Sequence, residues 1–126
     1  MTVFDQDVTI IAGDRVDLRY TVTDDATGEA VNVVPATAVA WQMSRIFSRS
    51  DGTDDFSSTP AVSKSLGSGI VVGPAQNLIV VSLNNVDTKS LVPGRYRCEL
   101  QITSLSGSGP YTVARGEITL LKELIK

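Results

Sequence analysis

The segment 95–103 alternates strictly between polar and apolar residues, and this pattern constrains the fold more than any other feature of the chain. Its apolar members are Tyr96, Cys98, Leu100 and Ile102, and its polar members are Arg95, Arg97, Glu99, Gln101 and Thr103. Successive side chains of a β-strand point to opposite faces of a sheet. The segment is therefore predicted to be a strand with one face in a core and the other in solvent.

Other segments repeat this pattern between turn signals rich in Gly, Asp and Ser. The further predicted strands are 7–11, 15–23, 30–34, 37–47, 61–66 with 69–72 as two short strands or one bent one, 78–83 and 111–121. Gly116 is predicted to mark a β-bulge in the last strand, and residues 48–60 to form a polar loop. One helical turn is expected within 84–91. The pattern predicts an all-β sandwich of seven to eight antiparallel strands, forming a single domain over residues 1–126 with a short tail at 122–126.

The composition excludes several classes of function. The 126 residues include no histidine, which removes Ser-His and Cys-His nucleophiles and histidine-ligated metal sites. The single cysteine, Cys98, cannot form a disulfide within the chain. The formal net charge of −3 disfavours non-specific nucleic-acid binding, and no apolar run approaches the ~20 residues that span a bilayer. The N-terminal residues lack the pattern of a secretory signal, so folding in a cytoplasm is expected.

Three carboxylates within residues 48–60 offer oxygen ligands that could hold calcium. Asp51, Asp54 and Asp55 lack the order and the closing Glu of an EF-hand, so a solvated acidic loop is preferred. The glycine-rich segment 67–73 lacks the spacing of a phosphate-binding loop and is interpreted as a hairpin. Trp41 is interpreted as a core anchor rather than a ligand platform. The sequence therefore predicts no catalytic residue, no cofactor and no metal site.

Five arginines occupy outward positions of the predicted strands. They are Arg15, Arg19, Arg95, Arg97 and Arg115. One interpretation is ordinary cross-strand pairing with Asp17, Glu99 and Glu117. The other is an arginine-rich sheet face that contacts an acidic partner, because arginine is enriched at interfaces and lysine is not.

The alternation fails at the end of the last predicted strand. One of Leu120 and Leu121 must point away from the core, and Leu124 and Ile125 follow in the tail. Large aliphatic side chains favour burial by about 25 cal/mol per Å² of apolar surface. The tail therefore either folds back onto the sandwich or docks on a neighbouring subunit. The candidate protein-interface residues are Arg95, Arg97, Arg115, Leu121, Leu124 and Ile125.

The run Leu-Val-Pro-Gly-Arg and the residues that follow it resemble the approach to the sixth strand of immunoglobulin-like domains. In those domains a tyrosine two residues before a cysteine position, here Tyr96 and Cys98, pins the preceding loop through its hydroxyl. Trp41 resembles the buried tryptophan of the same fold. The second strand has Leu18 and Tyr20 where the partner cysteine would be. The resemblance thus implies a sandwich without a disulfide, in which Cys98 is a small buried apolar residue.

Most of the chain also looks like the small immunoglobulin-like structural proteins of tailed bacteriophages, in particular the N-terminal domain of baseplate upper proteins and its stand-alone relatives. The segments that carry this likeness are 11–14, 91–96, 99–103 and 112–120. The resemblance implies a domain that docks on other virion proteins and does no chemistry. Expected partners are capsid, neck, tail or baseplate components and further copies of the chain, with no nucleic acid and no membrane.

No fibre or coiled coil follows the domain, so a free-standing adaptor or decoration protein is the expected role. Such a protein is made in the cytoplasm of the host bacterium and ends in the virion. The alternative is a carbohydrate or host-surface binding module of the same fold. Those modules usually expose aromatic side chains, and Phe47, Phe56 and Tyr111 are the aromatics not assigned to the core. A small hydrolase is the third alternative.

Overall fold

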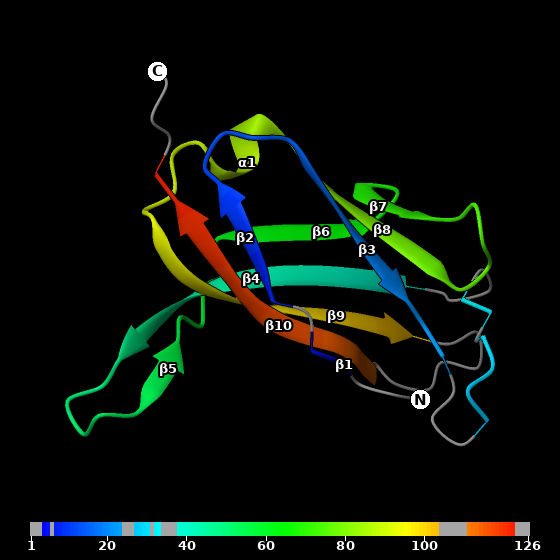
Figure 1. The fold of residues 1–126 in the computed structure, drawn as a ribbon, viewed down its shortest axis with the longest axis horizontal. Helices are drawn as coiled ribbons and strands as arrows, with labels where there is room; N and C mark the ends of the chain where they lie inside the picture. The colour runs from blue at the N-terminus through cyan, green and yellow to red at the C-terminus, as the bar shows by residue number, and fades with distance from the viewer. Residues whose placement is uncertain are drawn as a thin grey trace.

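The computed structural model describes residues 4–5, 7–23, 27–30, 32–33, 38–103 and 111–122. This part of the chain is all-β, and its helix α1 (Asn85–Thr88) is a single turn (Figure 1). The strands are β1 (Phe4–Asp5), β2 (Val8–Ile11), β3 (Val16–Thr21), β4 (Ala38–Ser48), β5 (Asp54–Phe56), β6 (Val62–Leu66), β7 (Gly69–Val72), β8 (Leu78–Leu83), β9 (Gly94–Thr103) and β10 (Tyr111–Leu121). The prediction of an all-β chain is confirmed.

The strands form one continuous, nearly closed sheet. Its order is β1-β10-β9-β4-β6-β7-β8-β3, with β2 also paired to β10 and β5 to β4. Strands β2 and β3, which lie near opposite ends of this path, are joined by the turn at residues 12–15 (Figure 1). The chain itself thus links the two ends of the sheet, and the inward faces enclose a single core.

The sheet is mixed rather than purely antiparallel, which corrects the predicted architecture. Strands β1 and β2 both pair with β10 in parallel. The turn after β2 carries the chain to β3 without closing a hairpin. Strands β6 and β7 also pair in parallel, over only two residue pairs. The turn between them is therefore not the hairpin that was predicted for 67–73. Gly67 and Gly69 have φ values of 84° and 96°, a backbone conformation that other residues rarely adopt.

Three buried side chains connect the two halves of the sheet across the core. Trp41 on β4 is fully buried, and its Nε1–H donates to the hydroxyl of Tyr20 on β3 at 3.1 Å. The same hydroxyl lies 4.0 Å from Sγ of Cys98 on β9. Burial is the largest cause that raises the pKa of the Cys98 thiol. The predictions that Trp41 anchors the core and that Cys98 is buried are confirmed.

The connection from β8 to β9 is fastened at several points. The Tyr96 hydroxyl donates to the carbonyl of Val92 at 2.6 Å, as the resemblance implied. The buried Thr88 of α1 accepts a hydrogen bond from the backbone N–H of Gly13 at 3.0 Å. These contacts hold α1 against the end of the sheet where β2 turns into β3.

The position of the bulge in β10 differs from the prediction. The bulge in β10 lies between Thr112 and Ala114 rather than at Gly116, because Val113 and Ala114 are consecutive apolar residues and both are buried. Gly116 instead lies in register, opposite Cys98. Gly116 precedes the point where the partner of β10 changes from β1 to β2. At this point Asp7 Oδ1 accepts a hydrogen bond from the backbone N–H of Glu117 at 2.9 Å.

Residues 48–60 are not a plain loop. They contain β5, which pairs with the end of β4 and forms a hairpin that projects from the sheet (Figure 1). We call residues 46–56 the wing. In the predicted strand 30–34, the described residues show one antiparallel bridge, from Ala30 to Thr23.

Candidate interaction surface

The outward face of β4, β9 and β10 carries three of the candidate interface residues. Arg95, Arg97 and Arg115 lie on it because they occupy the polar phase of their strands. Arg15 and Arg19 lie on or just before β3, at the far end of the strand path. The five outward arginines therefore do not form one arginine-rich face.

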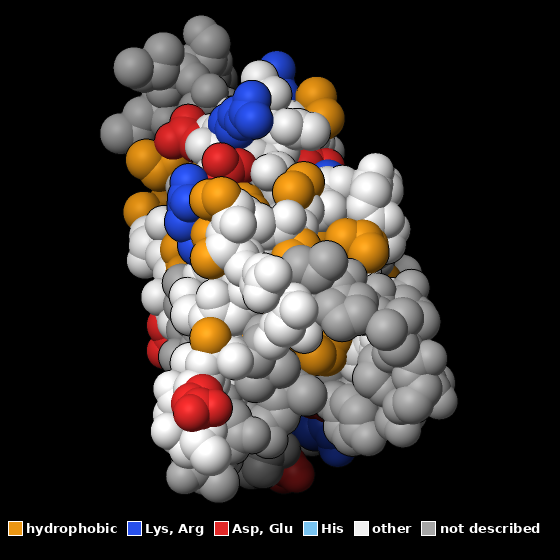
Figure 2. All heavy atoms as spheres, turned by 90° about the vertical axis from the view of Figure 1, so that its right-hand side faces the viewer, with side chains coloured by type: hydrophobic (Ala, Val, Ile, Leu, Met, Phe, Trp, Pro, Cys, Tyr) orange, Lys and Arg blue, Asp and Glu red, His pale blue; other side chains and the backbone are white. Residues whose placement is uncertain are grey.

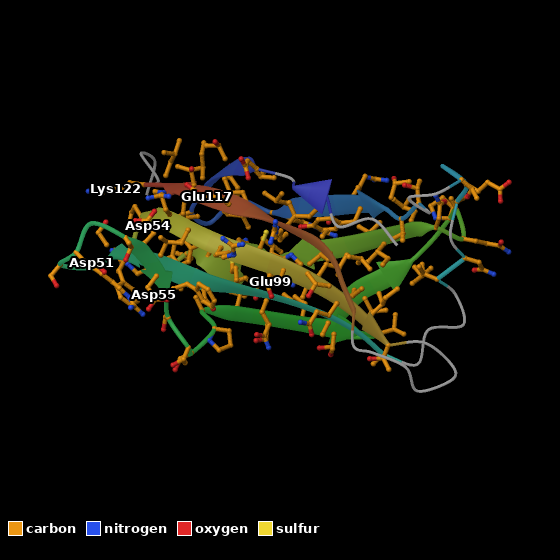
Figure 3. The ribbon with its side chains drawn as sticks, turned by 90° about the horizontal axis from the view of Figure 1, so that it is seen from below. Asp51, Asp54, Asp55, Glu99, Glu117 and Lys122 are labelled. Carbon is orange, nitrogen blue, oxygen red and sulfur yellow. The ribbon has the colours of Figure 1, made fainter. Side chains whose placement is uncertain are left out.

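Arg95 is paired within the molecule. Its guanidinium donates to the two carboxylate oxygens of Glu117 at 2.6 and 3.1 Å and to Asp54 of the wing at 3.2 Å. Figure 3 shows Asp54 and Glu117 close together, although one comes from β5 and the other from β10. The hydrogen bonds from Arg95 are the main cause that lowers the pKa of Glu117. For Arg95, the structure agrees with the pairing interpretation.

Arg97 is held more loosely. Its Nε lies 4.0 Å from a carboxylate oxygen of Glu99, and its guanidinium carbon lies 6.0 Å from the centre of the Phe56 ring. Arg115 is exposed, and its backbone is paired with that of Glu99 on β9. The face as a whole mixes both signs of charge, so it does not select an acidic partner by charge alone.

The acidic residues of the wing point to separate partners. Asp55 pairs with Arg49, Asp51 accepts from the backbone and hydroxyl of Thr53, and Asp54 faces Arg95. These hydrogen bonds lower the pKa values of Asp51 and Asp55. Figure 3 shows the three carboxylates spread along the hairpin rather than converging. Among the described residues, no group of acidic, Cys or His side chains is arranged to hold a metal ion.

The wing also exposes two aromatic rings, which the sequence analysis had left unassigned. Phe47 is 47% exposed and Phe56 is 50% exposed. Since Phe56 pairs with Ile46 and Phe47 with Asp55, the two rings lie on opposite faces of the hairpin. Phe56 faces the same side as Arg97 and forms part of a hollow. The other residues that line the hollow are Ala40, Gln42, Ser44, Arg97, Glu99 and Gln101.

A second surface feature lies where β2 and β10 end together. Leu120 is buried and Leu121 is 46% exposed, so one of the two leucines does point away from the core, as predicted. Leu121 pairs with Ile11 of β2, which is 44% exposed. The arrowheads of these strands lie side by side in Figure 1. Directly paired residues project to the same face, so Ile11 and Leu121 form a joint apolar pair.

Ile11 was not among the predicted interface residues, although the sequence carries a signal for it. The doublet Ile10-Ile11 breaks the alternation just as Leu120-Leu121 does. Leu124 and Ile125, which were predicted to be interface residues, lie outside the described residues. The side chain of Tyr111, one of the aromatics not assigned to the core, is not described either.

The end of the molecule opposite the wing also carries exposed hydrophobic side chains. Figure 2 views that end and shows hydrophobic side chains interspersed with uncharged ones, with the charged groups mainly above and below. Val71 on β7 is 60% exposed, and isolated exposed valines are common on soluble proteins.

Neither a search against models of protein families nor a search of curated proteins finds a match to this chain. In the part of the chain that the structure describes, no helix has the length and apolar character needed to cross a membrane.

Proposed function

We propose that the chain is a non-enzymatic structural protein of a tailed-phage virion, an adaptor or decoration protein that docks on other virion proteins. We further propose that its fold is an immunoglobulin-like sandwich. The strand order supports the second point, since β3, β8 and β7 would form one layer and β2, β10, β9, β4 and β6 the other. The bond from Tyr96 to Val92 and the buried Trp41 support it as well.

The observation that carries the docking role is the apolar pair of Ile11 and Leu121. Both side chains are nearly half exposed at the end of an otherwise well-buried strand pair, where Ile10 and Leu120 lie in the core. Covering the pair removes apolar surface from water at about 25 cal/mol per Å². The residues after Lys122 add Leu124 and Ile125 to the sequence next to this position. The proposed occupant is the surface of another virion protein.

The proposal is tested on phage particles. Particles made from the genome that encodes the chain are purified by density gradient, and their proteins are quantified by mass spectrometry. The proposal expects the chain at a fixed ratio to the major capsid or tail protein. Its absence from intact particles, with expression confirmed in the infected cells, would overturn the virion role.

A further inference from the structure

The hollow beside the wing is lined by small residues and by longer side chains with planar end groups. Along β4 and β9, the facing pairs are Ala40 with Gln101, Gln42 with Glu99, and Ser44 with Arg97. Ala40 and Ser44 leave space above the sheet, and successive pairs on this face lie about 7 Å apart. The floor is therefore elongated, and it can take a chain-like ligand rather than a single small ion.

Phe56 forms an aromatic part of this hollow. Phe56 is half exposed, and the Arg97 guanidinium lies over its ring, with the guanidinium carbon 6.0 Å from the ring centre. The salt bridge between Asp54 and Arg95 holds β5 to β9 and so fixes the wing relative to the floor. An aromatic ring positioned over a polar surface offers an apolar platform next to hydrogen-bonding groups.

The main polar groups of the hollow are the neutral amides of Gln42 and Gln101 and the oppositely charged side chains of Arg97 and Glu99. Gln42 makes no side-chain hydrogen bond with any residue that the structure describes, and the Gln101 amide donates to Thr112 Oγ1 at 3.4 Å. Each amide presents both donors and an acceptor on one plane. Arg97 and Glu99 cancel in formal charge. This combination favours a neutral ligand with adjacent hydroxyl groups over an anion or a cation.

We propose that the hollow binds a neutral oligosaccharide of hexopyranose units. One sugar ring lies with its apolar C–H face on the part of Phe56 that Arg97 does not cover. Hydroxyl groups of the chain exchange hydrogen bonds with Gln42, Glu99 and Gln101. This site is independent of the apolar pair at the end of β2 and β10, so it can be present whether or not the chain docks in a virion.

The test is an NMR titration of the ¹⁵N-labelled protein with cellohexaose, maltohexaose and chitohexaose in turn. The proposal expects at least one of these probes to shift the side-chain amide signals of Gln42 and Gln101 and to bind in the millimolar range or tighter. Phe56→Ala should weaken that binding about tenfold, since the stacking surface is lost. Phe47→Ala is the matched control, because Phe47 is equally exposed on the other face of the same hairpin. It should leave the affinity within about twofold.

Each variant is first compared with the wild type by its melting temperature, so that a loss of folding is not mistaken for a loss of binding. Gln42→Ala provides a second variant that leaves the wing intact, and it should also weaken binding. The proposal is overturned if none of the three hexasaccharides shifts the Gln42 and Gln101 signals. Shifts that map elsewhere, or an equal loss of affinity in Phe47→Ala and Phe56→Ala, overturn it too.

Discussion

At the scale of single residues, the core is organised by one hydroxyl group. Tyr20 accepts from Trp41 Nε1 and lies next to Cys98 Sγ, so a polar contact spans β3, β4 and β9 inside an apolar interior. A buried donor without a partner costs about 1–3 kcal/mol, more than a satisfied bond contributes. A hydrogen-bonded group of side chains thus links three strands of the sheet inside the core.

Tyr20→Phe tests this arrangement with almost no change in shape. The variant keeps the ring and leaves the indole N–H of Trp41 without its acceptor. We expect the free energy of unfolding to fall by about 1–3 kcal/mol, measured by urea denaturation. Unchanged stability would show that the hydroxyl is not needed to satisfy Trp41.

Cys98 should be inert in the native protein. Its side chain is 2% exposed, and burial raises the pKa of the thiol, so the reactive thiolate is scarce at neutral pH. We expect labelling by a thiol reagent to be slow without denaturant and to become fast across the unfolding transition. Rapid stoichiometric labelling of the folded protein would contradict the position of Cys98 in the core.

At the scale of elements, the sequence predicted which face of a strand is buried but not which strands pair. The inward residues of β3, β4 and β9 follow directly from the alternation. The parallel pairing of β2 with β10 joins residues about a hundred positions apart, and no local pattern encodes such a partner. The strand β5 is three residues long, too short for its periodicity to stand out. The hollow could not be predicted from the sequence either, because it forms only when the wing places Phe56 beside β9.

The end of the sheet near α1 is fastened by an ion pair with little solvent exposure. Lys64 Nζ on β6 lies 2.8 Å from Asp87 Oδ2, and Asp87 also accepts the backbone N–H of Asn84 at 2.7 Å. Burial alone would raise the pKa of Asp87, but the hydrogen bonds from Lys64 and Asn84 outweigh it and lower the pKa from its ordinary value of 3.8. A lowered pKa in the folded state means that the ionised carboxylate stabilises the fold.

Asp87→Asn should destabilise the protein by about 1–2 kcal/mol at neutral pH. The asparagine still accepts from the Asn84 N–H but loses the charge that faces Lys64. In the wild type, the contribution of Asp87 is complete above pH 3.8 and is lost as the pH falls through the lower pKa of the folded state. The stability difference between variant and wild type, followed by urea denaturation, should therefore shrink on acidification below that pH. A difference that does not change with pH would contradict an electrostatic role.

At the scale of the whole molecule, one sheet face carries two distinct features. The hollow lies over β4 and β9 beside the wing, and the apolar pair of Ile11 and Leu121 lies where β2 and β10 end. The sequence predicted Leu121 from a broken alternation, whereas the pairing with Ile11 required the fold. The proposed docking role is that this pair attaches the protein to a larger assembly.

Incorporation of point variants into phage particles tests that claim most directly. A phage lacking the gene is complemented with the wild type, Ile11→Ser, Leu121→Ser or the control Val71→Ser, which alters a 60% exposed valine on β7, away from the apolar pair. The amount of protein per particle is measured by quantitative mass spectrometry, and each purified variant is checked by thermal melting. We expect Ile11→Ser and Leu121→Ser to melt within a few degrees of the wild type, because surface substitutions change stability by only about 0.5 kcal/mol. Both should be depleted from particles about tenfold, since a loss of about 1.4 kcal/mol of apolar contact weakens binding by that factor. The control Val71→Ser should be retained at the wild-type level. Wild-type incorporation of both variants would show that the pair does not attach the protein to the particle.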